Sequence, residues 1–154
     1  MDNALPSVLF VCLGNICRSP LAEAILREKA ALRGFELFVD SAGTGSWHVG
    51  EAPCDNSVRV ARRHGLDIRA LRARQVRRED RERFDVIVGL DAQNIADLQK
   101  LGMANVHKLG SFGHGGEDVP DPYFFPGYEG FEKVYVMIET CCETLLGHLQ
   151  RGPF

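Results

Sequence analysis

The sequence predicts an α/β fold, in which a parallel sheet of four strands carries helices on both faces. Short apolar runs rich in β-formers alternate along the chain with longer segments whose apolar residues recur at helical spacing. Strands and helices in alternation form a parallel sheet through right-handed crossovers. The length of 154 residues fits one domain with one hydrophobic core. Ligands of such sheets bind at the carboxyl ends of the strands.

The first strand is expected at residues 7–12, SVLFVC, a continuous apolar run typical of a strand that is buried on both faces. A helix should follow, because Ser19 suits an N-cap, Pro20 suits the first helical position and Gly34 suits the C-terminal cap. The residues between Cys12 and Ser19 therefore form a loop at the carboxyl end of the first strand.

The remaining elements follow from the same patterns. We expect further strands at residues 35–43, 84–91 and 105–112, and further helices at residues 55–65, 92–102 and 129–150. The stretch from 112 to 128 is rich in turn residues and aromatics and is too long for a simple connection, which predicts a functional loop. The arginine-rich segment 72–83 also contains acidic residues, and we interpret it as a solvated helix face.

Composition and charge exclude several classes of function. The net charge of -3 gives no general attraction to nucleic acids or acidic membranes. No run approaches the roughly 18 apolar residues of a membrane span, and the N-terminus lacks the pattern of a signal peptide. We therefore expect a cytoplasmic protein with neither a nucleic acid nor a membrane as partner.

The cysteines indicate reduced thiols rather than a disulfide framework or a metal site. There are five of them, an odd number, and a chain of this size needs no disulfides. No C-x2-C pair occurs and the histidines form no matching ligand pair, so no structural zinc site is expected. Cys54 stands alone in the sequence, while Cys141 and Cys142 fall on the apolar stripe of the last helix as small core residues.

The loop after the first strand has the composition of an anion-binding nest. Between a buried strand and a helix N-terminus, successive backbone N–H groups can converge on one spot, and the helix dipole adds partial positive charge. Gly14 permits close approach of the backbone, and Asn15 tolerates a left-handed φ. Arg18 supplies a planar, bidentate partner for phosphate. The loop matches neither the Walker pattern nor a dinucleotide fingerprint.

Cys12 lies at the mouth of this nest, where the helix dipole, the N–H groups and a guanidinium all favour a thiolate. The Ser19 hydroxyl can donate a further hydrogen bond to it. The pattern C-x5-R-S suits nucleophilic attack on phosphorus, because the groups that bind phosphate also stabilise the attacking thiolate. The structural alternative is a buried cysteine that ends a strand and a surface arginine that opens a helix. The position of the pattern between strand and helix favours catalysis.

A thiolate that attacks phosphorus needs an acid to protonate the leaving oxygen, and the long loop offers two. Asp121 lies between prolines that restrict the backbone and fix the direction of the carboxyl group, whereas Asp118 is a less constrained rival. By composition alone, Asp121 is typical of a turn. Trp47, Tyr123 and Phe124 lie in irregular loops. They either pack in the core or flank the nest as an aromatic slot for a ring-bearing substrate.

Several blocks of the sequence resemble the low-molecular-weight protein tyrosine phosphatases in their order and spacing. These blocks are VCLGNICRSPLAEAI, VDSAGTGSWHVG, HGLDI, RARQ, FDVIVGLD and DVPDPYF. The resemblance covers residues 1–154 as a single phosphatase domain, and bacterial members are the most similar. It implies a three-layer, flavodoxin-like or Rossmann-like fold with strand order 2-1-3-4. It also implies hydrolysis of phosphotyrosine in proteins without metal or other cofactor, with a bacterial tyrosine kinase as a partner by analogy.

The resemblance assigns the catalytic steps to residues of this chain. Cys12 would be the nucleophile that becomes phosphorylated, and Arg18 would clamp the phosphate oxygens. Ser19 would help to activate the thiolate. Asp121 would protonate the phenolic oxygen and then take a proton from the attacking water.

The resemblance also assigns supporting roles. Asn15 would hold the strained loop, with Ser41 as one partner. Leu71 stands where many members have a histidine that would join this network, so the loop is either less rigid or held by another polar group. Cys17 would pair reversibly with Cys12 under oxidation. The phosphate loop and the cleft walls would be completed by Leu13, Gly14, Ile16, Trp47, Tyr123 and Phe124.

Three alternatives to a tyrosine phosphatase stay open at this point. Protein-arginine phosphatases of the same family typically carry a small polar residue at the position of Ile16, where an apolar side chain favours a phenyl ring. Arsenate reductases of the same fold need further cysteines past the middle of the chain, and none lies between Cys54 and Cys141. A non-catalytic phosphate-binding module would be expected to lack Cys12 or Asp121, and both are present.

Overall fold

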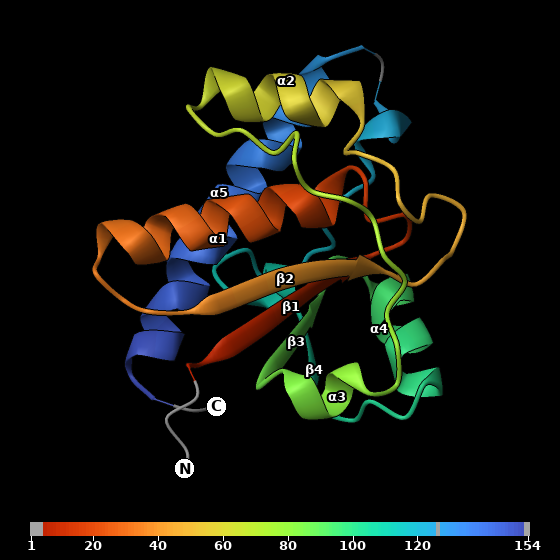
Figure 1. Cartoon of the computed structure of the whole chain (residues 1–154). Coiled ribbons are helices and arrows are strands. Elements are labelled where there is room, and N and C mark those ends of the chain that lie inside the picture. Colours follow the sequence, from red (N-terminus) through yellow and green to blue (C-terminus); the bar gives the residue numbers. More distant parts are fainter. Residues whose placement is uncertain (1–4, 126, 153–154) are drawn as a thin grey trace.

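A four-stranded parallel sheet forms the centre of the structure, a computed structural model that describes residues 5–125 and 127–152. The strands are β1 (Ser7–Cys12), β2 (Phe38–Gly43), β3 (Val86–Gly89) and β4 (Val106–Lys108). They lie in the order β2-β1-β3-β4, and each neighbouring pair is parallel (Figure 1). The predicted fold class and strand order are confirmed. β1 has the predicted bounds, and the other three strands are shorter than the runs that predict them.

Helices cover both faces of the sheet (Figure 1). On one face α1 (Arg18–Leu32) packs against α5 (Glu129–Gln150), and α2 (Asp55–Arg63) packs against both. On the other face lie α3 (Asp80–Arg83) and α4 (Ala92–Lys100). Two 3-10 helices, η1 (Leu109–Ser111) and η2 (Pro122–Phe124), lie between β4 and α5. The last helix has the bounds that its periodicity predicts, and its two cysteines are buried as expected.

The side chains of β1 alternate between two hydrophobic cores, and the whole strand is buried. Val8, Phe10 and Cys12 belong to the core that contains α1 and α5. Leu9 and Val11 belong to the core on the side of α4. The alternation therefore directs Cys12, the last residue of the strand, toward the face on which α1 begins.

The start of α1 differs from the prediction. The helix begins at Arg18 with Cys17 as N-cap, so the assignment of Ser19 as N-cap is wrong. Asn15 has a left-handed φ of 58°, which turns the chain early enough for the helix to start there. Ser19 lies inside the first turn, and its hydroxyl contacts a strand residue instead of capping the helix. Gly34 follows the C-cap with a φ of 66°, as its predicted place requires.

The arginine-rich segment 72–83 is helical only at Asp80–Arg83, so the predicted helix face is wrong for most of it. Upstream of α3 the chain is extended, because the N–H of Gly43 at the end of β2 donates to the Arg74 carbonyl (2.8 Å). The Arg74 side chain also forms an ion pair with the buried carboxylate of Asp80. Tertiary pairing thus overrides the helical preference of this segment.

Candidate active site

The loop between β1 and α1, residues 13–17, is attached to the carboxyl end of β2. The N–H of Gly45 donates to the Leu13 carbonyl (2.9 Å). Gly43 permits this close approach, because a Cβ atom there would lie 2.8 Å from the same carbonyl oxygen. The start of the loop is therefore anchored between the carboxyl ends of the adjacent strands β1 and β2.

The side chain of Asn15 holds the loop in place through three hydrogen bonds. The backbone N–H of Arg74 donates to Oδ1 of Asn15 (3.0 Å), which fixes the orientation of the amide. Nδ2 then donates to the hydroxyls of Ser19 (2.8 Å) and Ser41 (3.0 Å). The expected contact between Asn15 and Ser41 is present, and the N–H of Arg74 is a partner that the sequence did not reveal.

The network ends on a buried carboxylate and does not need a histidine at position 71. The Ser41 hydroxyl donates to Glu23 (2.6 Å), and Arg27 pairs with the other oxygen of that carboxylate. Leu71 packs against the core instead. Within the described part of the chain, the Thr44 hydroxyl is the one buried side-chain polar atom without a hydrogen bond. The donors and acceptors around Asn15 are thus all paired.

The Cys12 sulfur has two hydrogen-bond donors directed at it. The N–H of Asn15 donates to Sγ (3.3 Å), and Oγ of Ser19 lies 3.0 Å from Sγ. Because the Ser19 oxygen already accepts from Asn15, its hydrogen is free to point at the sulfur. Both donors can stabilise negative charge on Sγ.

Arg18 projects from the first turn of α1 and is held by residues from across the sheet edge. Its Nη1 donates to the Asp91 carboxylate (2.7 Å) and to the Val119 carbonyl (2.9 Å). Burial alone lowers the pKa of the guanidinium, but Cys12 and Asp91 outweigh burial and raise this pKa, so the group stays charged. Both contacts use Nη1, which leaves the edge formed by Nε and Nη2 for phosphate oxygens.

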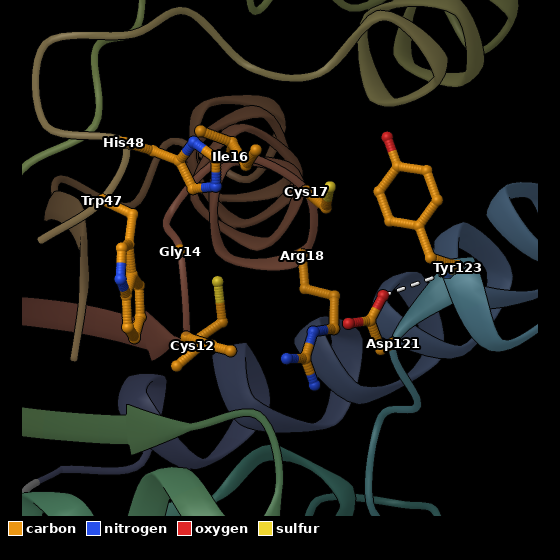
Figure 2. Close-up of a pocket in the computed structure, with 10 residues that line it drawn as sticks. Cys12, Gly14, Ile16, Cys17, Arg18, Trp47, His48, Asp121 and Tyr123 are labelled. Carbon is orange, nitrogen blue, oxygen red and sulfur yellow. Dashed lines mark hydrogen bonds between the residues drawn. The ribbon is translucent and has the colours of Figure 1, made fainter. Parts of the chain in front are cut away.

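A cavity of about 150 Å³ opens above the loop. It is lined by Cys12, Leu13, Gly14, Ile16, Cys17, Arg18, Trp47, His48, Asp121 and Tyr123. Figure 2 shows the Cys12 sulfur pointing into this space, with Trp47 on one side and Asp121 on the other. A protein cavity of about 150 Å³ is large enough to bind benzene. The cavity therefore suits a single aromatic ring.

Two exposed aromatic side chains form the rim of this cavity. Trp47 is 71% exposed and Tyr123 is 61% exposed. Gly45 leaves room for the Trp47 ring, because a Cβ atom at Gly45 would lie 1.9 Å from it. Of the two alternatives for these aromatics, the cavity rim applies to Trp47 and Tyr123 rather than the core. The side chain of Phe124 lies outside the part that the structure describes.

The two candidate acids have different surroundings. Asp121 lines the cavity, and its Oδ1 accepts a hydrogen bond from the N–H of Tyr123 (3.0 Å) at the start of η2 (Figure 2). Asp118 accepts from the N–H of Ala92 (3.0 Å) and from the Lys108 ammonium (2.9 Å), so it ties the loop to α4 and β4. Asp121 has the position that a proton donor to a bound substrate needs.

Sequence reasoning missed four residues of the site: Glu23, His48, Arg74 and Asp91. Asp91 holds Arg18 and also caps α4 by accepting from its third residue. Its position directly after a predicted strand, at the edge where ligands bind, was an available signal. Glu23 also had a signal in the sequence, because it is an acidic residue within a helical turn that is buried. His48 lies on the cavity wall, and nothing in its sequence context indicated that.

Cys54 stands alone in the sequence, but in the structure it lies against Cys17. The two sulfurs are 2.8 Å apart. The start of α2 folds onto the phosphate loop, where the N–H of Cys54 donates to the Ile16 carbonyl (2.9 Å). A tertiary contact of this kind has no signature in residue spacing. The expected pairing of Cys17 with Cys12 stays a prediction.

Residues 5–125 and 127–152 offer neither a metal-binding cluster nor a membrane span. No three His, Cys, Asp or Glu side chains in that part are grouped so that they could hold a metal ion. No helix there is both long and apolar enough to cross a membrane.

The chain is similar in sequence and in structure to several phosphatases. The chain is 42% identical to the low molecular weight protein-tyrosine-phosphatase YfkJ of Bacillus subtilis over 153 residues, 94% of this chain and 96% of YfkJ. The crystal structure of YfkJ covers 98% of both chains at 40% identity with a TM-score of 0.89. PtpA of Staphylococcus aureus, a protein with the same description, is 36% identical over 92% of both chains. The crystal structure of DARP, a drosophila arginine phosphatase, matches 92% of this chain and 96% of DARP at 36% identity, with a TM-score of 0.86.

A parallel α/β sheet whose first strand leads through a C-x5-R-S loop into a helix defines the class of cysteine-dependent phosphatases. Within this class, the model of the low molecular weight phosphotyrosine protein phosphatases matches residues 7–153. The chain belongs to this family, and the resemblance seen in the sequence is confirmed.

Proposed function

We propose that this chain is a protein-tyrosine phosphatase that hydrolyses phosphotyrosine and other aryl phosphates through a cysteinyl-phosphate intermediate. The observation that carries the proposal is the convergence of Cys12, Arg18 and Asp121 on one cavity. They are a nucleophile, a fixed cation and a carboxylic acid. Family membership and the names of its relatives YfkJ and PtpA support the same activity.

The first step transfers the phosphoryl group to the enzyme. The Cys12 thiolate attacks phosphorus, the bond from phosphorus to the phenolic oxygen breaks, and protonated Asp121 passes its proton to that oxygen. The free edge of Arg18 and the N–H groups of the loop bind the other phosphate oxygens, where negative charge spreads in the transition state. The phenol leaves as a neutral molecule.

The second step releases inorganic phosphate. Water attacks phosphorus in the position that the phenol has left, and the Asp121 carboxylate takes a proton from this water. The bond between sulfur and phosphorus breaks, and the electrons return to Cys12 as a thiolate. The hydroxyl of Ser19, aligned by Asn15, stabilises this leaving thiolate.

The shape of the cavity supports an aryl substrate over a phosphorylated guanidinium. Ile16 lines the wall with an aliphatic side chain, and Leu13 and Tyr123 extend the apolar surface toward the rim. A phenyl ring gains from burial against such walls, whereas a guanidinium would lose water against them. Because DARP is a relative of comparable similarity, arginine phosphate is a necessary comparison in any assay.

The proposed setting is the cytoplasm, with tyrosine-phosphorylated proteins as substrates and a tyrosine kinase as the enzyme that makes them. We propose residues 1–154 as one phosphatase domain that needs no nucleic acid, membrane or cofactor. A net charge of -3 and the reduced state that Cys12 requires support this setting.

A direct comparison of three phosphopeptides tests the proposal. Under reducing conditions, the protein is incubated with peptides of matched sequence that carry phosphotyrosine, phosphoserine or phosphoarginine, and released phosphate is measured. We expect the highest kcat/KM for phosphotyrosine. A higher value for phosphoarginine would contradict the assigned substrate, and no turnover of any peptide or of p-nitrophenyl phosphate would contradict the enzyme itself.

A further inference from the structure

Cys17, which lines the active-site cavity, forms a close thiol pair with Cys54. Their sulfurs are 2.8 Å apart, about 0.8 Å longer than the bond in a disulfide. The two backbones are already fastened together, because the N–H of Cys54 donates to the Ile16 carbonyl (2.9 Å) and the Ser57 hydroxyl donates to the Cys17 carbonyl (2.9 Å). A covalent bond between the sulfurs would need only a small movement of the side chains.

Both cysteines lie at helix N-termini, where backbone dipoles favour an anion. Cys17 is the N-cap of α1 and Cys54 is the N-cap of α2. The Cys17 thiol, Ser57 and the Tyr123 hydroxyl lower the pKa of Cys54 to about 6, against burial, which alone would raise it. The hydrogen bond to Cys54 and burial raise the pKa of Cys17. The negative charge of the pair therefore resides on Cys54.

The two other cysteines outside the catalytic position have none of these properties. Cys141 and Cys142 are fully buried in α5, and burial raises the pKa of both thiols. Thiols of this kind react slowly with oxidants. Of these four thiols, we therefore expect Cys17 and Cys54 to be the ones that react with oxidants.

We propose that Cys17 and Cys54 are a redox pair that hydrogen peroxide converts into a disulfide, while Cys12 stays a free thiol. Neither cysteine takes part in the proposed hydrolytic steps, so the proposal stands whether or not the assigned substrate is correct.

The reaction takes one peroxide and two thiols. The Cys54 thiolate attacks one peroxide oxygen, the O–O bond breaks, and the other oxygen leaves as water after taking up a proton. Cys54 is now a sulfenic acid without charge, so the hydrogen-bonded anion that raised the pKa of Cys17 is gone. Cys17 then loses its proton and attacks the Cys54 sulfur, the S–O bond breaks, and the second oxygen leaves as water. Two thiols and one hydrogen peroxide give one disulfide and two waters.

The disulfide would change what Cys17 can do for the active site. Cys17 can form one disulfide only, so pairing with Cys54 excludes the expected pairing with Cys12. The bond would also link the phosphate loop covalently to the start of α2. Cys17 and Cys54 thus consume one hydrogen peroxide, and the nucleophile Cys12 takes part in no disulfide.

Peptide mapping of the oxidised full chain tests this proposal. The reduced protein is treated with hydrogen peroxide, free thiols are blocked with N-ethylmaleimide, and a tryptic digest is analysed without reduction. Cys12 and Cys17 share the peptide 1–18, whereas Cys54 lies in the peptide 34–59. We expect these two peptides to be linked, with Cys12 carrying the blocking group. The same link is expected in Cys12→Ser, where position 17 is the only thiol left in the first peptide.

Matched variants separate the proposal from its alternatives. Cys54→Ser and Cys17→Ser should each abolish the linked peptides, and Cys141→Ser should leave them unchanged. Circular dichroism and thermal unfolding of each variant check that it is folded. A product in which Cys17 is joined only to Cys12, or a Cys12→Ser protein whose two peptides stay unlinked after oxidation, would overturn the proposal.

Discussion

The phosphate loop, residues 12–18, and the acid loop, residues 113–125, meet at one cavity but are built differently. In the phosphate loop, buried Asn15 makes three side-chain hydrogen bonds, two of them with distant residues, the Ser41 hydroxyl and the backbone N–H of Arg74. In the acid loop, the described contact of the Asp121 carboxylate is with the N–H of Tyr123, two residues away, and Tyr123 is 61% exposed. Asn15 is thus held by distant residues, whereas the described hydrogen bond of Asp121 comes from its own loop.

This difference assigns a separate task to each loop. Stabilising charge in a transition state requires donors that are already in place, because their reorganisation would cost free energy during the reaction. Delivering a proton requires one carboxyl group within hydrogen-bond reach of the leaving oxygen. Substitutions in the phosphate loop should therefore alter both oxyanion binding and turnover, whereas substitution of Asp121 should alter turnover alone.

The largest effect is expected for Cys12→Ser. Loss of a covalent nucleophile should reduce kcat by about 10⁵–10⁶-fold, while inorganic phosphate still binds because Arg18 and the loop N–H groups remain. Turnover of p-nitrophenyl phosphate and phosphate binding by calorimetry measure the two effects. A variant that retains near-normal turnover would show that another group attacks phosphorus.

The next effect is expected for Asp121→Asn. Loss of the acid should reduce kcat by about 10²–10⁴-fold, and most for phenols that leave poorly. Phosphate affinity should not change, because the acid loop does not hold the oxyanion. Asp118→Asn is the matched control, since its carboxylate binds Lys108 and the N–H of Ala92 instead. If Asp118→Asn, and not Asp121→Asn, produced this leaving-group-dependent loss of kcat, the assignment of the acid would be wrong.

Asn15→Ala tests whether the phosphate loop depends on its long-range contacts. The variant removes one hydrogen bond each from Ser19, Ser41 and the N–H of Arg74 and forces alanine into a left-handed φ. We expect kcat to fall by about 10–100-fold, which corresponds to about 1.4–2.7 kcal/mol, with weaker phosphate binding and a lower Tm. Ser41→Ala removes one of these contacts and should have a smaller effect on each quantity. Unchanged phosphate binding in Asn15→Ala would contradict the comparison of the two loops.

The pH dependence of alkylation tests whether Cys54 carries the negative charge of the cysteine pair. Because the pKa of Cys54 is lowered to about 6, its thiolate predominates at pH 7, and its reaction with iodoacetamide should slow about tenfold between pH 7 and pH 5. Cys141, whose pKa burial raises to about 11, should react far more slowly at both values. Mass spectrometry of the tryptic peptides gives both rates. Equal rates of alkylation of Cys54 at pH 7 and pH 5 would contradict the assignment of a thiolate to Cys54.

The smallest effect is expected for Leu71→His. Since the network around Asn15 has its partners without a side chain at this position, kcat should change by less than about threefold, or about 0.6 kcal/mol. Stability should fall, because Leu71 packs against the core. Leu71→Met keeps the apolar contact and serves as the control. A large gain in kcat for the histidine variant would show that the loop of the natural chain is incompletely held.

The parts predictable from sequence are those that local patterns determine. The buried run of β1, the stripe of α5 and the C-x5-R-S loop are each contiguous, so periodicity and spacing identify them. The strand order and Ser41 as a partner of Asn15 came from the family resemblance. The contact of Cys17 with Cys54, the support of Arg18 by Asp91 and the non-helical course of residues 72–79 depend on contacts between distant segments. Composition carries no signal for such contacts.

Trapping of the covalent intermediate tests the central claim most directly. The enzyme is mixed with excess p-nitrophenyl phosphate, quenched within the first turnovers, and digested for mass spectrometry. We predict a phosphoryl group on Cys12 in the peptide 1–18, and none in Cys12→Ser. A phosphoryl group on another residue, or turnover at the normal rate with no phosphorylated enzyme at any time, would contradict the account.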